Sequence, residues 1–553
     1  MARKRAEIIE LDAKRVEELL RRAEERSFEA EDYQTIRLLV ESYACLTSML
    51  GDKNTSIARL RKLLFGASTE KTAAVVGQTE SPASSDEPIA EGAAQQSAEG
   101  ERKSPRKKGH GRNGADAYAG AEKFNVAHES LRAGDACLDC LEGTVYATAP
   151  GVLVRIVGQA PLGAKLYQLQ KLRCNLCGEV YTAQAPEGVG SEKYDATAAS
   201  MIGVLKYGSG LPFNRIEGLQ QNMEIPLPAA TQWEIIEDAA ALLAPAHDEL
   251  VRQAAQGELV QNDDTAVKIL ELMGKRARKQ AIQEVDTPKN KDGSQRTGHF
   301  TSGVVSTGDG QRIALFFSGR QHAGENLRDV LRQRAQTRAA PIQMCDALSR
   351  NVPGELATIM ANCLAHARRN FVDVYDRFPD ECRHVLEALK IIYKNDAEAR
   401  QQKLSPEERL ALHQAQSRPV MDKLRDWLKK QFDDHLVEPN SPLGSAILYM
   451  LAHWDKLTLF LRQAGAPLDN NLCERVLKKA ILHRKNALFY KTQNGARVGD
   501  MYMSLIHTCE LCGVGAFDYL TELQRHAGEV AAKPADWMPW NYRQTLGAAQ
   551  TAA

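Results

Sequence analysis

The chain has 553 residues, too many for a single hydrophobic core, so several domains are expected. Hydrophobic residues make up 43%, charged residues 26%, and Lys plus Arg equals Asp plus Glu at 71 each. This balance excludes a protein that binds polyanions through its overall charge, so any DNA affinity must come from local clusters of cations. Acids and bases interrupt every long apolar run, so we expect no membrane partner and a bacterial cytoplasmic, nucleoid-associated location.

Residues 1–71 carry apolar side chains at alternating steps of three and four. This period is typical of a coiled-coil seam and predicts a helix through which the chain forms a homo-oligomer. The seam residues are Ile36, Leu39, Tyr43, Leu46, Leu50, Ile57, Leu60 and Leu64. Gly51 interrupts the pattern and weakens a continuous helix, so a helical hairpin packed on its own protein stays open as an alternative.

Residues 72–115 change to small, polar sequence rich in Pro and Gly. Such sequence cannot bury enough surface to offset its ordering entropy, so we predict a flexible linker. Its basic run over residues 102–112 either holds the DNA backbone electrostatically or is simply solvated, and both interpretations stay open.

Two CxxC pairs within residues 116–195 predict a zinc-binding domain. Four thiolates at this spacing form a closed site, in which Zn²⁺ would stabilise the fold without taking part in catalysis. The four ligands would be Cys137, Cys140, Cys174 and Cys177. The long interval between the pairs keeps free cysteines open as the alternative. A third pair, Cys509 and Cys512, lies in a helical pattern without a second pair nearby and is interpreted as buried thiols.

The remainder of the chain predicts a mixed α and β architecture. Residues 196–256 read as helices that pack or bind DNA, and residues 257–525 as one catalytic domain with strands first and helices later. The expected strands lie within 258–273, 297–308, 311–319 and 340–348, a helical insertion occupies 367–460, and a C-terminal tail follows over 526–553. The fold class is therefore multidomain α+β.

The stretch 468–486 predicts a helix that combines an acid with many cations. We expect Asn471 to be its N-cap and Glu474 to lie in its first turn. One apolar face is predicted from the spacing of Cys473, Val476, Leu477 and Ala480. The plainer interpretation of the same residues is a capping box and an ordinary ion pair between Glu474 and Lys478.

Two further acids occupy the ends of predicted strands. Asp263 ends the apolar part of the first strand, and Asp346 follows the fourth strand. A sheet places functional groups at such strand ends, and a buried carboxylate is costly unless a cation neutralises it. Together with Glu474, these acids could hold two divalent ions for phosphoryl transfer, and Mg²⁺ suits ligands that are all oxygen.

Motifs along nearly the whole chain resemble, in the same order, those of insertion-sequence-sixty-six family transposases. The matching stretches are LLFGASTEK, the paired cysteines, NDDT, QMCDAL, NCLAHARRNF, LDNNLCERVLKKAILHRKNALF, SLIHTCELCGV and WMPWNY. The resemblance implies a leucine-zipper-like N-terminal segment, a zinc-binding domain and a ribonuclease-H-like DDE domain with a helical insertion before the last acid. It further implies that Asp263, Asp346 and Glu474 are the catalytic acids of a Mg²⁺-dependent enzyme.

By the same resemblance, the enzyme would cleave the 3′ ends of an insertion sequence and join them to target DNA, with helper proteins from the same element as possible partners. Seven residues are predicted to contact DNA or support the site: His366, Arg368, Arg369, Asn470, Arg484, Lys485 and Asn486. Asp264 competes with Asp263 for the first catalytic position, because the family usually has Glu-Thr-Pro after the first acid. A catalytically inactive DNA-binding regulator and a nuclease that cuts without joining remain alternatives.

Overall fold

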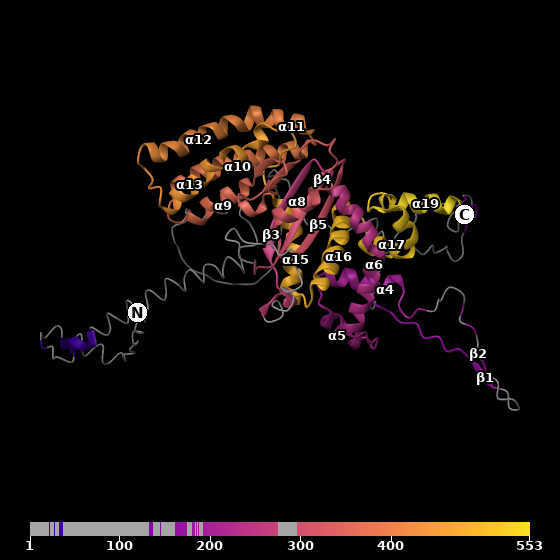
Figure 1. Ribbon diagram of the computed structural model, residues 1–553. Coiled ribbons are helices and arrows are strands. Elements are labelled where there is room, and N and C mark those ends of the chain that lie inside the picture. The colour runs from indigo at the N-terminus through magenta and orange to yellow at the C-terminus, as the bar shows by residue number, and fades with distance from the viewer. Residues whose placement is uncertain are drawn as a thin grey trace. The chain divides into compact units, whose positions relative to one another are not determined.

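The structure is a computed structural model of the full chain (Figure 1). It describes residues 192–274 and 296–552, together with residues 161–173, 180–182 and a few isolated positions before residue 187. The predicted linker, the four cysteines of the predicted zinc site and nearly all of the predicted coiled coil lie outside the described residues.

A short hairpin brackets the second CxxC pair. Strand β1 (Lys171–Arg173) pairs antiparallel with β2 (Val180–Thr182), and the register joins Arg173 to Val180. Cys174 and Cys177 therefore fall in the segment that connects the two strands.

The chain divides into two compact units, which we describe separately. One comprises Met1–Ser84 and Ala361–Asp469, and its described residues from 361 onward are called the helical unit. The other comprises Ser85–Met360 and Asn470–Ala553 and is called the sheet unit. The predicted insertion 367–460 falls in the helical unit, whereas the stretch from Asn470 onward belongs with the sheet.

A five-stranded sheet in the order β5-β4-β3-β6-β7 organises the sheet unit (Figure 1). Neighbours β3, β4 and β5 are antiparallel, whereas β3 and β6 are parallel. The strands are β3 (Leu259–Ala266), β4 (Phe300–Gly308), β5 (Gln311–Gly319), β6 (Ile342–Cys345) and β7 (Ile359–Asn362). All four predicted strands are present, and β7 was not predicted.

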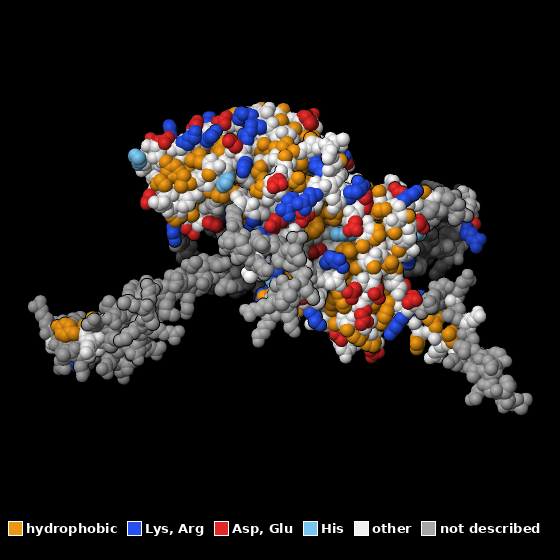
Figure 2. All heavy atoms as spheres, in the orientation of Figure 1, with side chains coloured by type: hydrophobic (Ala, Val, Ile, Leu, Met, Phe, Trp, Pro, Cys, Tyr) orange, Lys and Arg blue, Asp and Glu red, His pale blue; other side chains and the backbone are white. Residues whose placement is uncertain are grey.

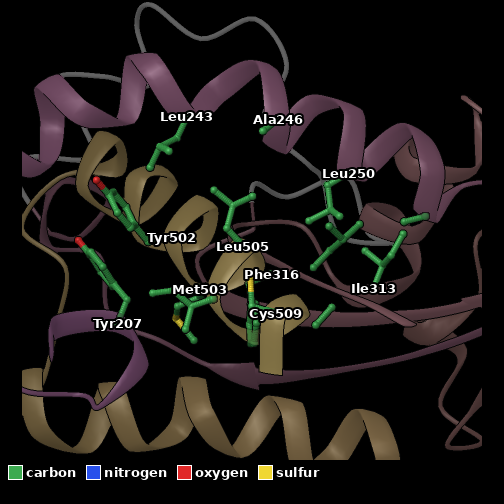
Figure 3. Close-up of a cluster of buried hydrophobic side chains, with 14 of the residues drawn as sticks. Tyr207, Leu243, Ala246, Leu250, Ile313, Phe316, Tyr502, Met503, Leu505 and Cys509 are labelled. Atoms are coloured by element: carbon green, nitrogen blue, oxygen red, sulfur yellow. The ribbon is translucent and has the colours of Figure 1, made fainter. Parts of the chain in front are cut away.

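Helices cover this sheet and supply most of its core. Helices α6 and α16 meet over β5, and Figure 3 shows Leu243 of α6, Leu505 of α16 and Phe316 of β5 in one buried cluster. The helices are α4 (Ala196–Gly203), α5 (Phe213–Asn222), α6 (Ala229–Ala254), α8 (Ala323–Leu331), α15 (Asn471–Ala487), α16 (Gln493–Cys512), α17 (Ala516–Arg525), α18 (Ala527–Ala532) and α19 (Tyr542–Ala552). Short turns are the π-helix η3 (Val204–Gly208) and the 3-10 helices η4 (Leu270–Leu272), η5 (Ser349–Asn351) and η8 (Pro534–Trp537).

Two predictions about this unit need correction. The segment 526–553 is not a tail, because α18, η8 and α19 pack on the sheet unit and bury Trp537, Met538 and Tyr542 in the main core. The segment 196–256 is not separate either, since Ile236 and Leu250 of α6 belong to the same core. This packing agrees with one of the two interpretations of the segment, and DNA binding by it stays a prediction.

Side chains of α16 close the outer edge of the sheet. The backbone N–H groups of Ala314, Phe316 and Ser318 in β5 point away from β4 and donate to α16 instead of to another strand. Their acceptors are Thr508 Oγ1 (3.0 Å), Ser504 Oγ (3.0 Å) and Asp500 Oδ2 (2.6 Å). Because these three residues are four apart, they lie on one helix face and protect the exposed edge strand.

The helical unit confirms the helical pattern predicted for 367–460. Its elements are α9 (Leu364–Val374), α10 (Pro379–Gln401), α11 (Pro406–Leu412), the π-helix η6 (His413–Ser417), α12 (Arg418–Asp433), α13 (Pro442–Ala452), α14 (Trp454–Leu457) and the 3-10 helix η7 (Leu459–Leu461). A buried Asp396 on α10 joins them, accepting from Arg409 Nε (2.7 Å) and lying 3.3 Å from His413 Nε2.

The described surface carries mixed charge. On the face drawn in Figure 2, basic and acidic side chains are interspersed, in keeping with the equal numbers in the sequence. Among the described residues, no helix is long and apolar enough to cross a membrane.

Candidate active site

Strand β3 presents its two neighbouring acids to opposite faces of the sheet. Successive side chains of a strand alternate in direction, so Asp263 shares a face with Gln261, and Asp264 points the other way. On the antiparallel partner, Gly303 of β4 lies opposite Asp263 and Ser302 opposite Asp264. The two candidates for the first catalytic position therefore have different surroundings.

Asp346 lies level with Asp263 on the neighbouring parallel strand. The register pairs Gln261 with Met344, and each acid follows its member of this pair by two residues. Adjacent strands are about 4.8 Å apart, so side chains at the same level on the same face are neighbours. Asp346 Oδ1 also accepts hydrogen bonds from Leu348 N (3.2 Å) and from Asn351 Nδ2, which fix the carboxylate where the chain leaves β6.

Helix α15 brings Glu474 to the same face. The helix approaches the sheet closely at Gly303, where an added Cβ would meet Leu477 Cδ1 at 3.4 Å and Cys473 Sγ at 3.7 Å. The predicted apolar face is confirmed, because Cys473, Val476, Leu477 and Ala480 are all buried. Glu474 occupies the first turn, where the positive end of the helix dipole favours a carboxylate.

The start of α15 is anchored by Asn470, which corrects two predictions. The N-cap is Asn470, not Asn471, and its side chain does not cap the helix. Instead, the fully buried Asn470 side chain donates to Asn262 O (3.2 Å) and accepts from Gln261 Nε2 (3.4 Å). Since it is buried against β3, Asn470 positions the helix that carries Glu474 and is not available to contact DNA.

The electrostatics of Asp263 reflect this convergence of acids. Burial raises the pKa of its carboxyl to about 7, the hydrogen bond from Asp264 N (2.8 Å) acts in the opposite direction, and the charges of Asp346, Asp264 and Glu474 raise the pKa further. Three carboxylates gathered on one sheet face repel one another, and a divalent cation would relieve this repulsion. Their oxygens are the hard ligands that Mg²⁺ prefers, so the donor set fits that ion.

Asp264 interacts with a histidine and an arginine on the opposite face of the sheet from Asp263. Its side chain is only 2% exposed, lies 2.8 Å from His322 Nδ1 and pairs with Arg350 Nη2 at 3.4 Å. A carboxylate held by two basic side chains is already compensated and gains little from a metal. Of the two competing acids, Asp263 is the one that faces Asp346 and Glu474.

A buried polar network behind the acids was missed by the sequence analysis. Gln343 Nε2 donates to Asn262 Oδ1 (2.9 Å) and to Asn351 O (2.7 Å), and Asn262 Nδ2 donates to the same carbonyl (2.9 Å). All three side chains are fully buried. Because Asn351 also holds Asp346, the network positions the second acid. The available signal was a polar residue inside each of two apolar strand patterns.

The structure gives several predicted DNA contacts an internal partner. Arg484 donates to Thr265 Oγ1 (2.9 Å) and to Ala266 O, and Asn486 Nδ2 donates to Gly210 O (3.1 Å). These bonds attach the far end of α15 to the end of β3 and to the loop before α5. Lys485, by contrast, is exposed.

The remaining predicted contacts, His366, Arg368 and Arg369, lie on α9 in the helical unit. Arg368 is buried, whereas His366 and Arg369 are half-buried. Their role in DNA binding stays a prediction.

Comparison with known proteins agrees with this arrangement. Residues 193–498, more than half of the chain, match the family described as Transposase IS66 family. The chain belongs to this family. The match runs from just before α4 into α16 and includes all three acids.

Relatives from Sinorhizobium fredii (strain NBRC 101917 / NGR234) are similar over about two thirds of this chain. Uncharacterized protein y4jD is 27% identical over 383 residues, which cover 67% of this chain and 71% of the relative. Uncharacterized protein y4hP is 26% identical over 411 residues, which cover 68% of each chain.

Proposed function

We propose that this member of the transposase family is an active DDE enzyme, which cleaves the 3′ ends of an insertion sequence and transfers them to target DNA. Its catalytic domain would be ribonuclease-H-like, a proposal supported by a mixed sheet in which Asp263 lies within β3 and Asp346 directly follows the adjacent parallel strand β6. Asp263, Asp346 and Glu474 would hold two Mg²⁺ ions. DNA is the proposed partner, both as element ends and as target.

The observation that carries the proposal is the convergence of Asp263, Asp346 and Glu474 on one side of the sheet, which also raises the pKa of Asp263. Burial is the main cause of the raised pKa, and the carboxylates of Asp346 and Glu474 contribute to it although they come from β6 and α15, far apart in the sequence. Bringing three acids together, so that the charges of Asp346 and Glu474 act on Asp263, lowers the stability of the fold. A loss of stability of this kind is typical of a functional site.

Each part of the site has a separate task in this proposal. When bound, the metal ions would stabilise the charges of the attacking and leaving oxygens. Asp263 supplies a carboxylate fixed by the N–H of Asp264, and Asp346 one fixed by Asn351. Asn470 keeps the first turn of α15, and with it Glu474, beside β3. Catalysis would then depend on positioning and charge compensation, without a covalent intermediate on the protein.

A strand-transfer assay tests this function. The full-length protein, a labelled duplex carrying an element end, and Mg²⁺ should give joined product, whereas Glu474→Gln should give none. Glu234→Gln is a matched control, because Glu234 is exposed on α6. DNA bound equally by wild type and Glu474→Gln but never cut, even with helper proteins added, would favour an inactive regulator. Cleavage without joining would favour a nuclease.

Structural zinc and self-association belong to the same proposal. The β1–β2 hairpin supports a zinc site, because it holds Cys174 and Cys177 in its connecting segment, as a metal-binding turn requires. One equivalent of zinc per chain, lost on Cys174→Ser, would support the site, and zinc-free protein would exclude it. The molecular mass in solution with and without residues 1–71 would test the proposed coiled coil.

A further inference from the structure

The helix that carries Glu474 ends in a strained turn. Leu488 has φ 68° and ψ −41°, and Phe489 N donates to Ala487 O (2.8 Å), which closes a γ-turn with Leu488 at its centre. A residue other than glycine costs about 1 to 3 kcal/mol in such a conformation. Both side chains face solvent, with 63% of Leu488 and 44% of Phe489 exposed. Strain combined with exposed apolar surface has no benefit for folding and indicates a functional role.

The turn is held firmly on both sides. Before it, Leu488 N donates to Arg484 O (2.8 Å), the last turn of α15. After it, Tyr490 N donates to Lys268 O (2.8 Å) and Tyr490 O accepts from Leu270 N (2.9 Å). The Tyr490 ring also stacks on His483, with centroids 5.1 Å apart. The Leu488–Phe489 turn is therefore presented rigidly.

Three exposed lysines lie near the Leu488–Phe489 turn, two of them within three residues along the chain and one at the backbone contact of Tyr490. Lys268, Lys485 and Lys491 are exposed, and no carboxylate of the described part of the chain lies within ion-pair distance of them. Glu271 on η4 accepts from Gln493 N (2.7 Å). This combination is complementary to a DNA duplex: exposed lysines can bind phosphates, and exposed apolar side chains can contact stacked bases.

We propose that the Leu488–Phe489 turn is a wedge that enters a DNA duplex lying along α15 and unstacks one base step. The lysines would hold the phosphates on either side while the two apolar side chains replace base stacking. At about 1.5 Å per residue, the turn lies about 21 Å along the helix from Glu474, the span of about six base pairs. The proposal rests on DNA being the substrate of the proposed function, and it adds a deformation of that DNA away from the cleaved phosphate.

The test uses duplexes that carry 2-aminopurine, a base whose fluorescence rises on unstacking, at successive positions from the element end. Full-length Glu474→Gln protein should raise the fluorescence at one step, about six base pairs from the cleavage position. Adding Leu488→Ser and Phe489→Ser should remove most of the increase, while affinity measured by anisotropy falls less than about tenfold. Because the assay requires no cleavage, its result is independent of whether the enzyme is active.

Two controls separate the wedge from the fold. Leu488→Gly suits the positive φ, so it should unfold at a higher temperature than its parent and still lose part of the fluorescence increase. Leu448→Ser removes a leucine of α13 that is 45% exposed and should change nothing.

An increase that persists without both side chains, or none at any position in bound wild-type complex, overturns the proposal. Loss of a protein dimer in the double variant, with the fluorescence increase intact, would instead assign the Leu488–Phe489 turn to protein association.

Discussion

Asp263 is half-buried and Asp500 is buried beside the central sheet, and both carboxyls have a pKa raised to about 7, with burial as the main cause. Their neighbours differ. Asp263 faces the carboxylates of Asp346 and Glu474, which raise its pKa further. Asp500 instead accepts from Ser318 N (2.6 Å) and lies 2.8 Å from Ser318 Oγ, and these hydrogen bonds lower its pKa.

The comparison distinguishes two roles for a carboxyl group whose charged form is disfavoured by burial, one structural and one proposed to be functional. The neutral form of Asp500 has a hydrogen-bonding partner for each oxygen, because a protonated carboxyl can donate to Ser318 Oγ while it accepts from Ser318 N. Asp500 is therefore part of the structure that closes the sheet edge. Among the described residues, Asp263 accepts a hydrogen bond from the N–H of Asp264, and the proposed metal ion would compensate its charge. A raised pKa thus marks a functional site only in combination with the groups around it.

The largest expected effect is on strand-transfer activity, which should depend on Asp263 and not on Asp500. Asp263→Asn should lower strand transfer by about 10³-fold or more, because it removes a proposed metal ligand at the reacting phosphate. The same change should raise the free energy of unfolding without metal, since it removes a buried charge. Asp500→Asn should leave strand transfer within about twofold. Joined product and urea unfolding of both variants provide the measurement, and an active Asp263→Asn enzyme would refute the assignment.

Both Asp263 and Asp500 should make stability depend on pH, and substitution of Asp500 isolates its share. The folded pKa of Asp500, about 7, exceeds the ordinary value near 3.8, so the folded state holds the proton more tightly than the unfolded chain. Between these values, the contribution of Asp500 to the free energy of unfolding should fall as pH rises, by about 4 kcal/mol in total. Asp500→Asn should flatten this fall in urea titrations from about pH 5 to pH 8. A variant with the same slope as wild type would show that Asp500 is ionised throughout.

A smaller effect on stability is expected at the sheet edge, where the Ser504 hydroxyl accepts a hydrogen bond from β5. Ser504→Ala leaves the buried N–H of Phe316 without its acceptor, which should cost about 1 to 3 kcal/mol of unfolding free energy. Cys512→Ala, at the half-buried end of the same helix, should cost less than about 0.5 kcal/mol. Chemical denaturation compares the two. Equal stability would mean that water replaces the hydroxyl at the edge.

Local pattern predicted much of this architecture. Alternating apolar residues identified β3 to β6, and three- and four-residue steps identified the buried face of α15 around Cys473 and Leu477. The position of Asp346 directly after β6 followed from those elements, whereas Asp263 lies inside β3, which continues to Ala266. Strand β7 was not predicted, because its four residues are too few to show a period and only the last two are buried.

Features that depend on a distant partner could not be predicted. Asp500, Ser504 and Thr508 read as polar positions on a helix, and their role requires knowing that an edge strand lies beside them. Asn470 and Asn471 are equally good caps by residue type, and only the packing against Asn262 O selects Asn470. The zinc ligands and the coiled coil stay predictions, because they lie outside the described residues.

The smallest expected effect is a pH dependence of the affinity for Mg²⁺. This dependence should require Asp263. Because the pKa of its carboxyl is raised to about 7, Mg²⁺ must displace a proton below that pH, and binding should weaken by about tenfold for each pH unit below 7. Above that pH the affinity should level off. Calorimetric titration of full-length protein with Mg²⁺ in buffers of different ionisation enthalpy would count the released proton. Asp264→Asn should keep this dependence, since Asp264 is paired with His322 and Arg350, whereas Asp263→Asn should abolish it. Affinity that is independent of pH in the wild-type protein would show that the cation binds without displacing a proton from Asp263.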